Sequence, residues 1–561
     1  MLPNYRIWRN RVKTLHAFDH RAIPEETARI AKAAFPKGNP YMKMRDELGV
    51  LYQDSEFADL FPTSGQSALR PGQLALTTVM QFAEGLSDRQ AAEAVRGRID
   101  WKYALNMELT DPGFDYSVLS EFRGRLIEGG EEERLLDDML VKFKEKGWLK
   151  SRGRQRTDAT HVLGVVRQLN RLECVGETMR QALEALAEVV PEWLLSQITR
   201  DWFDRYGIRF ESYRLPKEKK EKEVLQLQIG EDGGHLLAAI YAPQTPSKLR
   251  TLLEVEIMRQ IWIQQYYVQN GQLKWREQDD LPPHNLLIQS PYDIEARNRT
   301  KRSLNWTGYM VHLTETCDED SLNLIVNVET TPATRADIKV LDQIHTSLDD
   351  KELLPGEHLV DTAYVDGEHL HTSHHDYGVD LFGPVPPNSS WQSKAGQGFD
   401  LPCFAIDWQA QTVTCPQGRI SHSWQPGQDP KGNEIIKVQF RRTECRTCHC
   451  RDRCTKSKTS PRGLQFKPRI EYEALQVARQ RQETDQFKQT YKKRAGVEGT
   501  ISQATRSFDL RRSRYVGLAK THLQHIAIAA AMNFSRVWAW LEQRPKAQTR
   551  RSKFLALASV T

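Results

Sequence analysis

Two stretches of sequence, NWTGYMVHLTETC at residues 305–317 and NLIVNVETTPA at residues 323–333, decide the fold class of this chain. The first is rich in β-branched and aromatic residues and the second in β-branched residues, a pattern typical of two antiparallel strands. ADIKVLDQIHTSL (336–348) then has the period of a helix. EHLVDTAYVDGEHL (357–370) adds a short strand that ends at Asp361. This mixture of strands and helices predicts an α/β fold.

Strand candidates on both sides extend the predicted sheet. Upstream, an apolar run typical of a buried strand follows Asp158 in RTDATHVLGVVRQLN (156–170). Downstream, VDLFGPVPP (379–387) gives one more strand, closed by prolines. A strand, a hairpin, a helix and a strand with an acid at its end follow the order of an RNase H-like fold. We therefore predict an RNase H-like mixed sheet with its core at residues 291–385, and a linker and first strand at 141–176.

The N-terminal part, residues 1–140, is predicted to be a helical domain, because its apolar residues recur at a spacing of 3.6. Ser87, with Gln90 three residues later, predicts the start of one of these helices. A turn and a further helix that carries Arg123 and Arg125 suit a helix-turn-helix-like DNA-binding unit. An ordinary helical bundle fits the same pattern at least as well.

Two insertions and a C-terminal region are predicted around the sheet, since 561 residues are too many for a single core. Residues 177–290 have a mainly helical pattern. Residues 386–470 lack periodicity and are rich in Gly, Pro and Cys, so we expect a Cys-rich insertion there. Residues 471–540 are expected to hold a long helical stretch and further C-terminal helices, and 541–561 a basic tail.

The overall composition limits the class of function without identifying a partner. The net charge of +6 is a mild bias, but Lys and Arg gather in clusters, as expected for a polyanion partner; a merely solvated surface fits equally well. We find no run of about 18 apolar residues and no secretory signal, so we expect no membrane span and a cytoplasmic protein. The sequence lacks a GxxxxGK[ST] loop, so nothing suggests ATP hydrolysis.

Three acids occupy positions that make chemical sense together. Asp158 lies at the first strand, Asp361 ends a later strand, and Glu498 lies in the helical region after the second insertion. Carboxylates at strand ends and on a facing helix can converge on one edge of a mixed sheet, where their hard oxygens suit Mg²⁺ or Mn²⁺. Two such ions can activate water on one side of a phosphodiester and stabilise the leaving oxygen on the other.

Cysteines in the second insertion follow the spacing C-x2-C-x-C-x3-C, and a further cysteine lies upstream in CPQG. In a cytosolic chain this spacing favours a closed, structural zinc site over disulfides. Free cysteines are the alternative. The expected zinc ligands are Cys415, Cys445, Cys448 and Cys454, with Cys450 or His449 able to replace one of them.

Several other residues near the acids are expected to be structural. The histidines between 369 and 375 invite comparison with a metal site, but a solvated or hydrogen-bonded role is favoured. Asp366 is expected to be a turn residue or a helix cap. Trp306 and Tyr309 are expected to pack in the core of the hairpin rather than to stack on a flipped base.

Blocks of sequence along most of the chain resemble bacterial insertion-sequence transposases of the DDE type. RTDATHVLG, WTGYMVHLTET, VNVETTPATRADI, EHLVDTAYVDGE and YKKRAGVEGTISQATRSFDLRRSRY are similar to the catalytic blocks of that family and occur in its order. LRPGQLALTTVMQFAEGLSDRQAAEAVRGRIDWKYAL is similar to its helical N-terminal domain.

The resemblance implies an activity, cofactors and partners. The family cuts its element out of double-stranded DNA at terminal inverted repeats and joins it to target DNA, by hydrolysis and by attack of a 3′-hydroxyl. Asp158, Asp361 and Glu498 match its catalytic acids, which implies Mg²⁺ or Mn²⁺. A similar cysteine cluster is common in the family. Synapsis of two ends implies a homodimer, associated with the nucleoid when it is bound to DNA.

The glutamate block of the family often reads Tyr-x2-Arg-x3-Glu-x6-Lys, and Tyr491, Arg494 and Glu498 fit it. Thr505 stands at the Lys position, and Arg506 follows it. Arg494 shares a helix face with Glu498, so it is expected either to bind a phosphate beside the metal ions or to pair with Glu498. The remaining basic residues of this block are expected to contact the DNA backbone or to be solvated; they are Arg511, Arg512 and Arg514.

Two alternatives to a transposase remain open from the sequence. One is a catalytically decayed or domesticated DNA-binding protein of the same fold, although all three acids are present. The other is a zinc-stabilised scaffold that does not act on DNA.

Overall fold

The computed structural model describes residues 13–14, 22–61, 66–67, 69–319 and 321–545. A six-stranded mixed sheet lies at its centre, with strand order β10-β9-β3-β7 and with β6 and β8 both paired to β7. The strands β3, β9 and β10 are parallel, and β6, β7 and β8 add antiparallel pairs. The predicted RNase H-like mixed sheet is confirmed. The strands are β3 (Arg154–Leu163), β6 (Arg297–Lys301), β7 (Leu304–Thr316), β8 (Ile325–Pro332), β9 (Glu357–Leu359) and β10 (Asp380–Phe382).

The hairpin that sets the fold forms by the expected pairing of β7 with β8. Tyr309 pairs with Pro332 and Leu313 with Val328, so the alternating apolar side chains of the two strands share one face. Trp306 and Tyr309 are almost completely buried, which confirms their core role. The helix α13 (Leu341–Asp350) follows and packs on β8.

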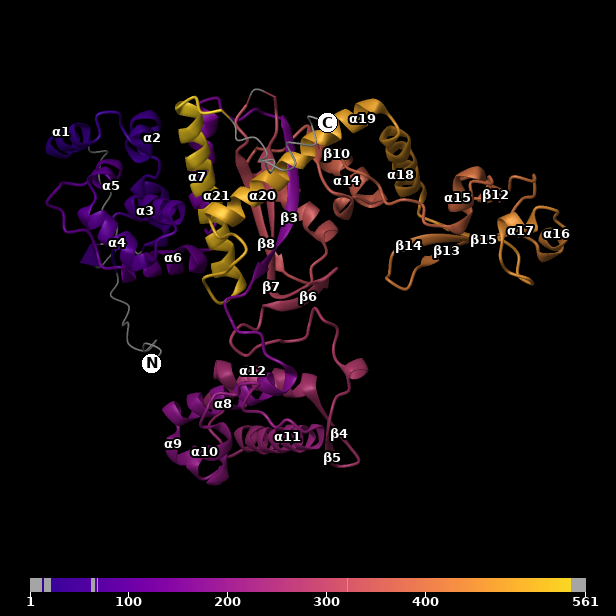
Figure 1. Ribbon diagram of the computed structural model, residues 1–561. Coiled ribbons are helices and arrows are strands. Elements are labelled where there is room, and N and C mark those ends of the chain that lie inside the picture. The colour runs from indigo at the N-terminus through magenta and orange to yellow at the C-terminus, as the bar shows by residue number, and fades with distance from the viewer. Residues whose placement is uncertain (1–12, 15–21, 62–65, 68, 320, 546–561) are drawn as a thin grey trace, which may run out of the picture.

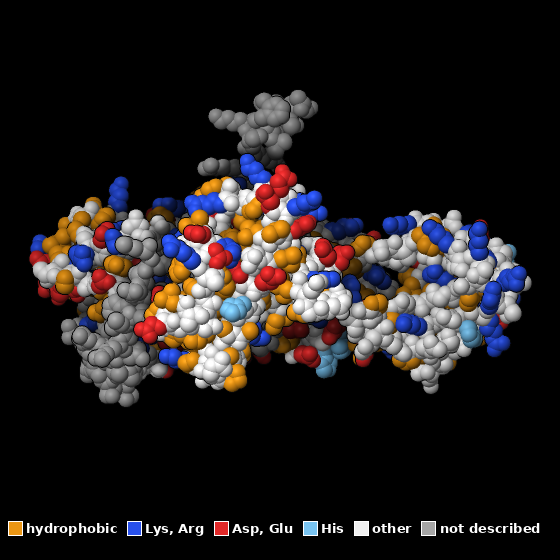
Figure 2. Space-filling model, turned by 90° about the horizontal axis from the view of Figure 1, so that it is seen from below, with side chains coloured by type: hydrophobic (Ala, Val, Ile, Leu, Met, Phe, Trp, Pro, Cys, Tyr) orange, Lys and Arg blue, Asp and Glu red, His pale blue; other side chains and the backbone are white. Residues whose placement is uncertain are grey.

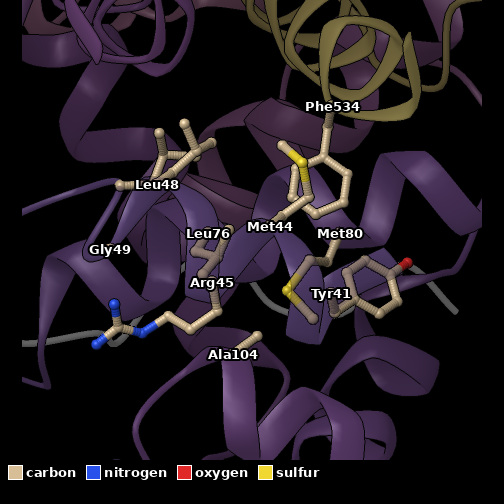
Figure 3. Close-up of a pocket in the computed structure, with 10 residues that line it drawn as sticks. Tyr41, Met44, Arg45, Leu48, Gly49, Leu76, Met80, Ala104 and Phe534 are labelled. Carbon is tan, nitrogen blue, oxygen red and sulfur yellow. The ribbon is translucent and has the colours of Figure 1, made fainter. Parts of the chain in front are cut away.

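The N-terminal helices share one continuous core with the sheet rather than forming an independent one. The connection is α21 (Leu518–Leu541), which contacts β8 on one side and α3 and α7 on the other. In Figure 3, Phe534 of α21 lies among Tyr41, Met44 and Met80, around a cavity of only about 10 Å³. The N-terminal helices are α1 (Glu25–Ala34), α2 (Pro40–Leu48), α3 (Pro71–Glu84), α4 (Asp88–Gly97), α5 (Ile99–Ala104), α6 (Ser117–Gly129) and α7 (Arg134–Glu145).

Local sequence signals account for where these helices begin. Ser87 accepts a hydrogen bond from the Gln90 amide, and the Gln90 side chain accepts one from the Ser87 amide at 2.9 Å. The predicted capping box of α4 is therefore confirmed. Asn39 caps α2 in the same way, through the Met42 amide at 2.9 Å.

The helical insertion leaves the core after β3 and has its own apolar core. Its first helix begins at Arg171, ahead of the predicted boundary at 177, because Asn170 and Glu173 form a capping box there. In Figure 1 this insertion lies beyond the β6 end of the sheet. Its main helices are α8 (Arg171–Val189), α11 (Lys219–Tyr241) and α12 (Leu253–Gln265), accompanied by α9 (Pro191–Leu195), α10 (Asp201–Tyr206) and the hairpin β4 (Tyr266–Gln269) and β5 (Gln272–Trp275).

The Cys-rich lobe, residues 386–470, projects from the opposite side of the sheet from the N-terminal helices (Figure 1). It contains regular structure that its sequence pattern does not predict: a two-stranded and a three-stranded antiparallel sheet around a small apolar core. The strands are β11 (Ala405–Asp407), β12 (Thr412–Thr414), β13 (Ser423–Gln428), β14 (Glu434–Gln439) and β15 (Gly463–Phe466), and the short helices are α15 (Trp391–Ala395), α16 (Arg442–Arg446) and α17 (Arg451–Cys454).

The chain returns from the lobe to the sheet through three helices where one long helical stretch is predicted. They are α18 (Arg469–Gln482), α19 (Asp485–Tyr491) and α20 (Gly496–Ser507), and the tight turn Lys492–Ala495 precedes α20. Thr484 starts α19 by accepting the Phe487 amide at 3.2 Å. None of the helices described here is long and apolar enough to cross a membrane.

Candidate active site

The three predicted acids come from neighbouring elements of the core. Asp158 lies in β3, and the register places Arg156 of β3 beside Leu359 of β9. Because β9 runs parallel to β3, the chain that continues from β9 brings Asp361 alongside Asp158. Glu498 lies in the first turn of α20, which packs on β3 and β7. The fold therefore gathers at one place three carboxylates that are far apart in sequence.

Arg494 contacts all three of these carboxylates. Its Nη2 lies 2.7 Å from Asp158 Oδ2 and 4.0 Å from Asp361 Oδ2, and its Nη1 lies 3.2 Å from Glu498 Oε1. The predicted pair of Arg494 with Glu498 is present, but the shorter contact is with Asp158. The acids differ in exposure: the side chain of Asp158 is 19% exposed, that of Asp361 47% and that of Glu498 66%.

Burial and charge act against each other at this site. Burial raises the pKa of Asp158, and the neighbouring Arg494 opposes that rise. Burial also disfavours the charged form of Arg494, but the carboxylates around it raise its pKa above the usual value. The site thus concentrates negative charge that one guanidinium partly neutralises. The three carboxylates supply the oxygen ligands that hard divalent cations such as Mg²⁺ or Mn²⁺ prefer. Their oxygens do not all lie within 4.8 Å of one another here, where Arg494 contacts each of them.

A cavity of about 350 Å³ opens directly beside two of the acids. Arg506 and Arg511 lie in its wall, so the cavity combines acids with cations that suit a phosphate. Thr505 also lines it, but its hydroxyl donates to the Ile501 carbonyl of its own helix at 2.8 Å. The lining residues are Asp158, Ala159, Thr160, Glu498, Ile501, Ser502, Thr505, Arg506 and Arg511.

The other residues predicted to bind DNA lie outside this cavity. Tyr491 stacks on Phe487, and burial raises its pKa to about 12. Arg512 is exposed, whereas Arg514 donates to the Leu86 carbonyl at 3.1 Å and so packs on the N-terminal helices.

In α6, both predicted arginines have internal partners. Arg123 is buried and pairs with Asp88 at 2.6 Å, because the Arg side chain fills the space between α4 and α6. Arg125 donates to the Leu60 carbonyl at 3.1 Å. Because both side chains have partners within the protein, we do not propose Arg123 and Arg125 as DNA contacts.

A buried charge network behind the site escapes the sequence patterns. Glu315 of β7 is fully buried and accepts from Arg156 at 2.7 Å, from Arg536 at 2.8 Å and from Thr500 at 2.6 Å. Arg156 also donates to the Lys493 carbonyl, next to Arg494. The network therefore ties the turn before α20, and α20 itself, to the strand that carries Asp158. The one sequence signal for it is an acid in line with Tyr309, Val311 and Leu313 on the apolar face of the strand.

Gly496 is where α20 approaches this network most closely. A Cβ added there would lie 2.0 Å from Arg156 Nη1 and 2.3 Å from Arg156 Cζ. We expect Gly496→Ala to destabilise the protein by about 1–3 kcal/mol, because the guanidinium is held by its partners. That cost exceeds the roughly 1 kcal/mol that Ala gains over Gly in a helix. Urea unfolding checks it. Gly499→Ala is the matched control in the same helix: its Cβ would meet nothing within 4 Å, so it should not destabilise.

Asp366 forms a different cluster. His, Cys, Asp and Glu side chains can hold a metal ion. Among the described residues, Asp366, Glu368 and His369 are the one group of three such side chains whose ligand atoms lie within 4.8 Å of one another. Asp366 caps α14 (Gly367–Tyr377) by accepting from the His369 amide at 2.9 Å and from its Nδ1 at 2.7 Å. The cap and hydrogen-bond roles expected for these residues account for the cluster.

The four predicted zinc ligands line one cavity of about 30 Å³ in the Cys-rich lobe. They come from the end of β12 and from the α16–α17 region, and the Arg419 amide donates to Cys415 Sγ at 3.4 Å. Burial raises the pKa of Cys454 to about 11, and the other three thiols add to the rise. Cys450 points elsewhere: it accepts from Arg453 at 2.8 Å. Thiols are ligands that zinc prefers, and these four line one small cavity, but no three of their sulfur atoms all lie within 4.8 Å of one another here. The ligands that line the cavity are Cys415, Cys445, Cys448 and Cys454.

Two family models match the chain. One, described as a transposase DDE domain, matches residues 414–538, which contain the four thiols, Arg494 and Glu498. The other, described as a transposase domain (DUF772), matches residues 29–125 within the N-terminal helices. The comparison with curated proteins gave no match. The two matched ranges lie before and after the residues that form the sheet, and they agree with the resemblance seen in the sequence blocks. The matches over residues 29–125 and 414–538 support an insertion-sequence transposase of the DDE type.

Proposed function

We propose that this transposase cuts DNA at the ends of its insertion sequence and joins those ends to target DNA, with divalent metal ions held by Asp158, Asp361 and Glu498. The observation that supports the proposal best is the convergence of these acids on one guanidinium beside an open cavity. Ordinary surface acids on three separate elements would not share a partner in this way.

Each residue has a definite task in this proposal. Asp158 and Asp361 are fixed by neighbouring strands, and Glu498 by the helix that packs on them. Metal ions bound there would activate the attacking oxygen and stabilise the leaving oxygen of a phosphodiester. Arg494, Arg506 and Arg511 would contact phosphates through charge-assisted hydrogen bonds, and so place the scissile bond over the acids. The structural observation that supports this task for Arg506 and Arg511 is their place in the cavity wall.

A cleavage assay on the element's own ends tests the proposal. The DNA that flanks the gene supplies the substrate: matched inverted repeats on its two sides are cloned and incubated with the full chain. We expect strand cleavage at the repeats with Mg²⁺ or Mn²⁺ and none with Ca²⁺ or without added metal. Joined products should form with target DNA. Binding to the repeats without cleavage under any divalent metal would support a DNA-binding protein instead. Sedimentation with and without paired ends tests the expected dimer.

Zinc binding by the four thiols gives a separate prediction. We expect about one zinc per purified chain, and its loss on Cys415→Ser or Cys448→Ser, because a closed site needs all four ligands. Metal analysis measures the zinc, and limited proteolysis reports unfolding of the lobe, since such sites contribute to folding directly. Cys450→Ser is the matched control because that thiol lies outside the cavity. Zinc retained after loss of Cys415 and Cys448 together would contradict the site.

A further inference from the structure

The positive charge of this protein is concentrated in the Cys-rich lobe. Residues 386–470 contain fourteen Lys and Arg and six Asp and Glu, in a chain whose total net charge is only +6. In contrast, residues 22–140, which form most of the N-terminal helices, contain thirteen Lys and Arg and twenty-one Asp and Glu. The unit expected from sequence to hold DNA is therefore acidic, and the lobe is the basic one.

Most exposed cations of the lobe have no acidic partner among the described residues. Ten Lys and Arg between residues 394 and 458 are exposed, and none of them forms an ion pair with a described carboxylate. The two ion pairs in the lobe, Lys467 with Glu471 and Arg469 with Glu473, lie at its junction with α18. Figure 2 shows Lys and Arg side chains spread over this face of the lobe with almost no acids between them.

Partly buried cations of the N-terminal helices are paired with acids. On the N-terminal helices Arg98 pairs with Glu84 and Asp100, and Arg134 pairs with Asp59. Like charges that are gathered on a small fold without partners repel one another, so the arrangement favours a polyanion that binds across them. Because the lobe is connected to the acid site, where the proposed function places DNA, duplex DNA is the polyanion that we consider.

Two helices connect the lobe to the segment that carries part of that site. The chain enters the lobe after β10, at the edge of the sheet, and leaves it through α18 and α19. These helices lead directly into the turn that carries Arg494. DNA held by the lobe is thus held by the segment that also sets the position of Arg494 and Glu498.

We infer that the Cys-rich lobe is a duplex-DNA-binding surface that contacts phosphates rather than bases. It supplies most of the sequence-independent DNA affinity of this transposase. The inference deepens the proposed function and rests on it for the identity of the polyanion. The zinc site then has a mechanical role: it would fix α16 and α17, from which several of these cations project. Arg441, Arg442 and Arg446 at α16 are exposed and adjacent to the thiols, and they form the most compact group.

The test is salt-dependent binding by the full chain. A variant with Arg441→Gln, Arg442→Gln and Arg446→Gln is compared with a control in which Arg29, Lys32 and Lys37 are changed to Gln. Both variants lose three exposed cations. Binding to a random-sequence duplex is measured without added Mg²⁺ over a range of salt concentrations. Each phosphate contact contributes about 0.9 to the slope of log Kd against log salt. We expect the slope measured for the lobe variant to be smaller by about 2–3 than that of the wild type, and its affinity to be at least tenfold lower. The control should bind like the wild type.

Equal binding by both variants, or an equal loss in both, would overturn the inference. Zinc content and circular dichroism show whether the lobe variant is folded. If it is not, Lys456→Gln with Lys458→Gln, in the segment after α17, replaces it with the same expectation for two contacts. The proposed function fails separately, through absence of metal-dependent cleavage by the wild type. In that case a lower salt slope for the lobe variant would still establish the lobe as a DNA-binding surface.

Discussion

We expect the Asp158→Asn variant to lose at least about 10³-fold in strand cleavage while it retains its fold and its affinity for DNA. The substitution keeps the shape of the side chain but removes the charge that a divalent cation requires. Metal ions contribute several kcal/mol to stabilising the charge of such a transition state, and each 1.36 kcal/mol is a factor of ten in rate. Asp361→Asn and Glu498→Gln should have effects of the same size, because the three carboxylates face the same place.

The measurement is single-turnover cleavage of end-containing DNA, with binding followed in parallel. Asp366→Asn is the matched control: it makes the same change five residues after Asp361, at an acid that caps α14 and contacts His369 instead of Arg494. That variant should lose about 1 kcal/mol of stability and little activity. Wild-type cleavage by any variant of the three acids would remove that acid from the site, and a comparable loss in the control would show that the assay reports stability.

The central sheet and the position of the acids could be predicted from sequence because both depend on local patterns. Alternation in residues 305–317 and 323–333 fixes a hairpin and its register. Acids at or after buried strands, such as Asp158 and Asp361, then meet wherever the strands are neighbours. Glu498 could be added to them because a helix after the second insertion can face the same edge of the sheet, and the glutamate block of the resembling family matches the same residue.

The positions that sequence patterns describe poorly are those that depend on tertiary contacts. Arg123 has the composition expected of a DNA contact, yet Asp88 binds it in the interior. The helical pattern of residues 470–500 looks continuous, but the Thr484 hydroxyl ends one helix and starts the next. In the Cys-rich lobe, strands form around a small apolar core, but each strand is too short for its alternation to stand out in the sequence.

The Glu315 network is the clearest case of a feature that only the fold defines. Its members lie on β3, β7, α20 and α21, and no local pattern relates them. Arg156 and Glu315 are direct neighbours across the β3–β7 ladder. Arg536 reaches the same carboxylate from α21 and also donates to Thr500 at 2.7 Å. A buried acid that accepts from two arginines and a hydroxyl has its charge compensated, so removal of the acid leaves Arg156 and Arg536 without their carboxylate.

We therefore expect Glu315→Ala to lower the free energy of unfolding by about 3–5 kcal/mol, the usual cost of breaking a buried ion pair from one side. Urea unfolding followed by tryptophan fluorescence measures it. Glu352→Ala removes an acid that is 81% exposed and pairs with Lys144, and should leave the free energy of unfolding almost unchanged. A loss below 1 kcal/mol for Glu315→Ala would mean that the two arginines find other partners.

The same network gives Glu315 an effect on catalysis that stability alone does not. Arg156 joins Glu315 to the Lys493 carbonyl, so the network holds the turn that places Arg494 beside Asp158. Glu315→Gln keeps the hydrogen-bond acceptor and should fold at low temperature, where its cleavage rate can be compared with that of the wild type. We expect cleavage to need a higher Mn²⁺ concentration, by about 10–100-fold, because residues that orient metal ligands affect metal affinity by that factor. Glu352→Gln should leave the Mn²⁺ dependence unchanged. A folded Glu315→Gln chain with the Mn²⁺ dependence of the wild type would limit Glu315 to a structural role.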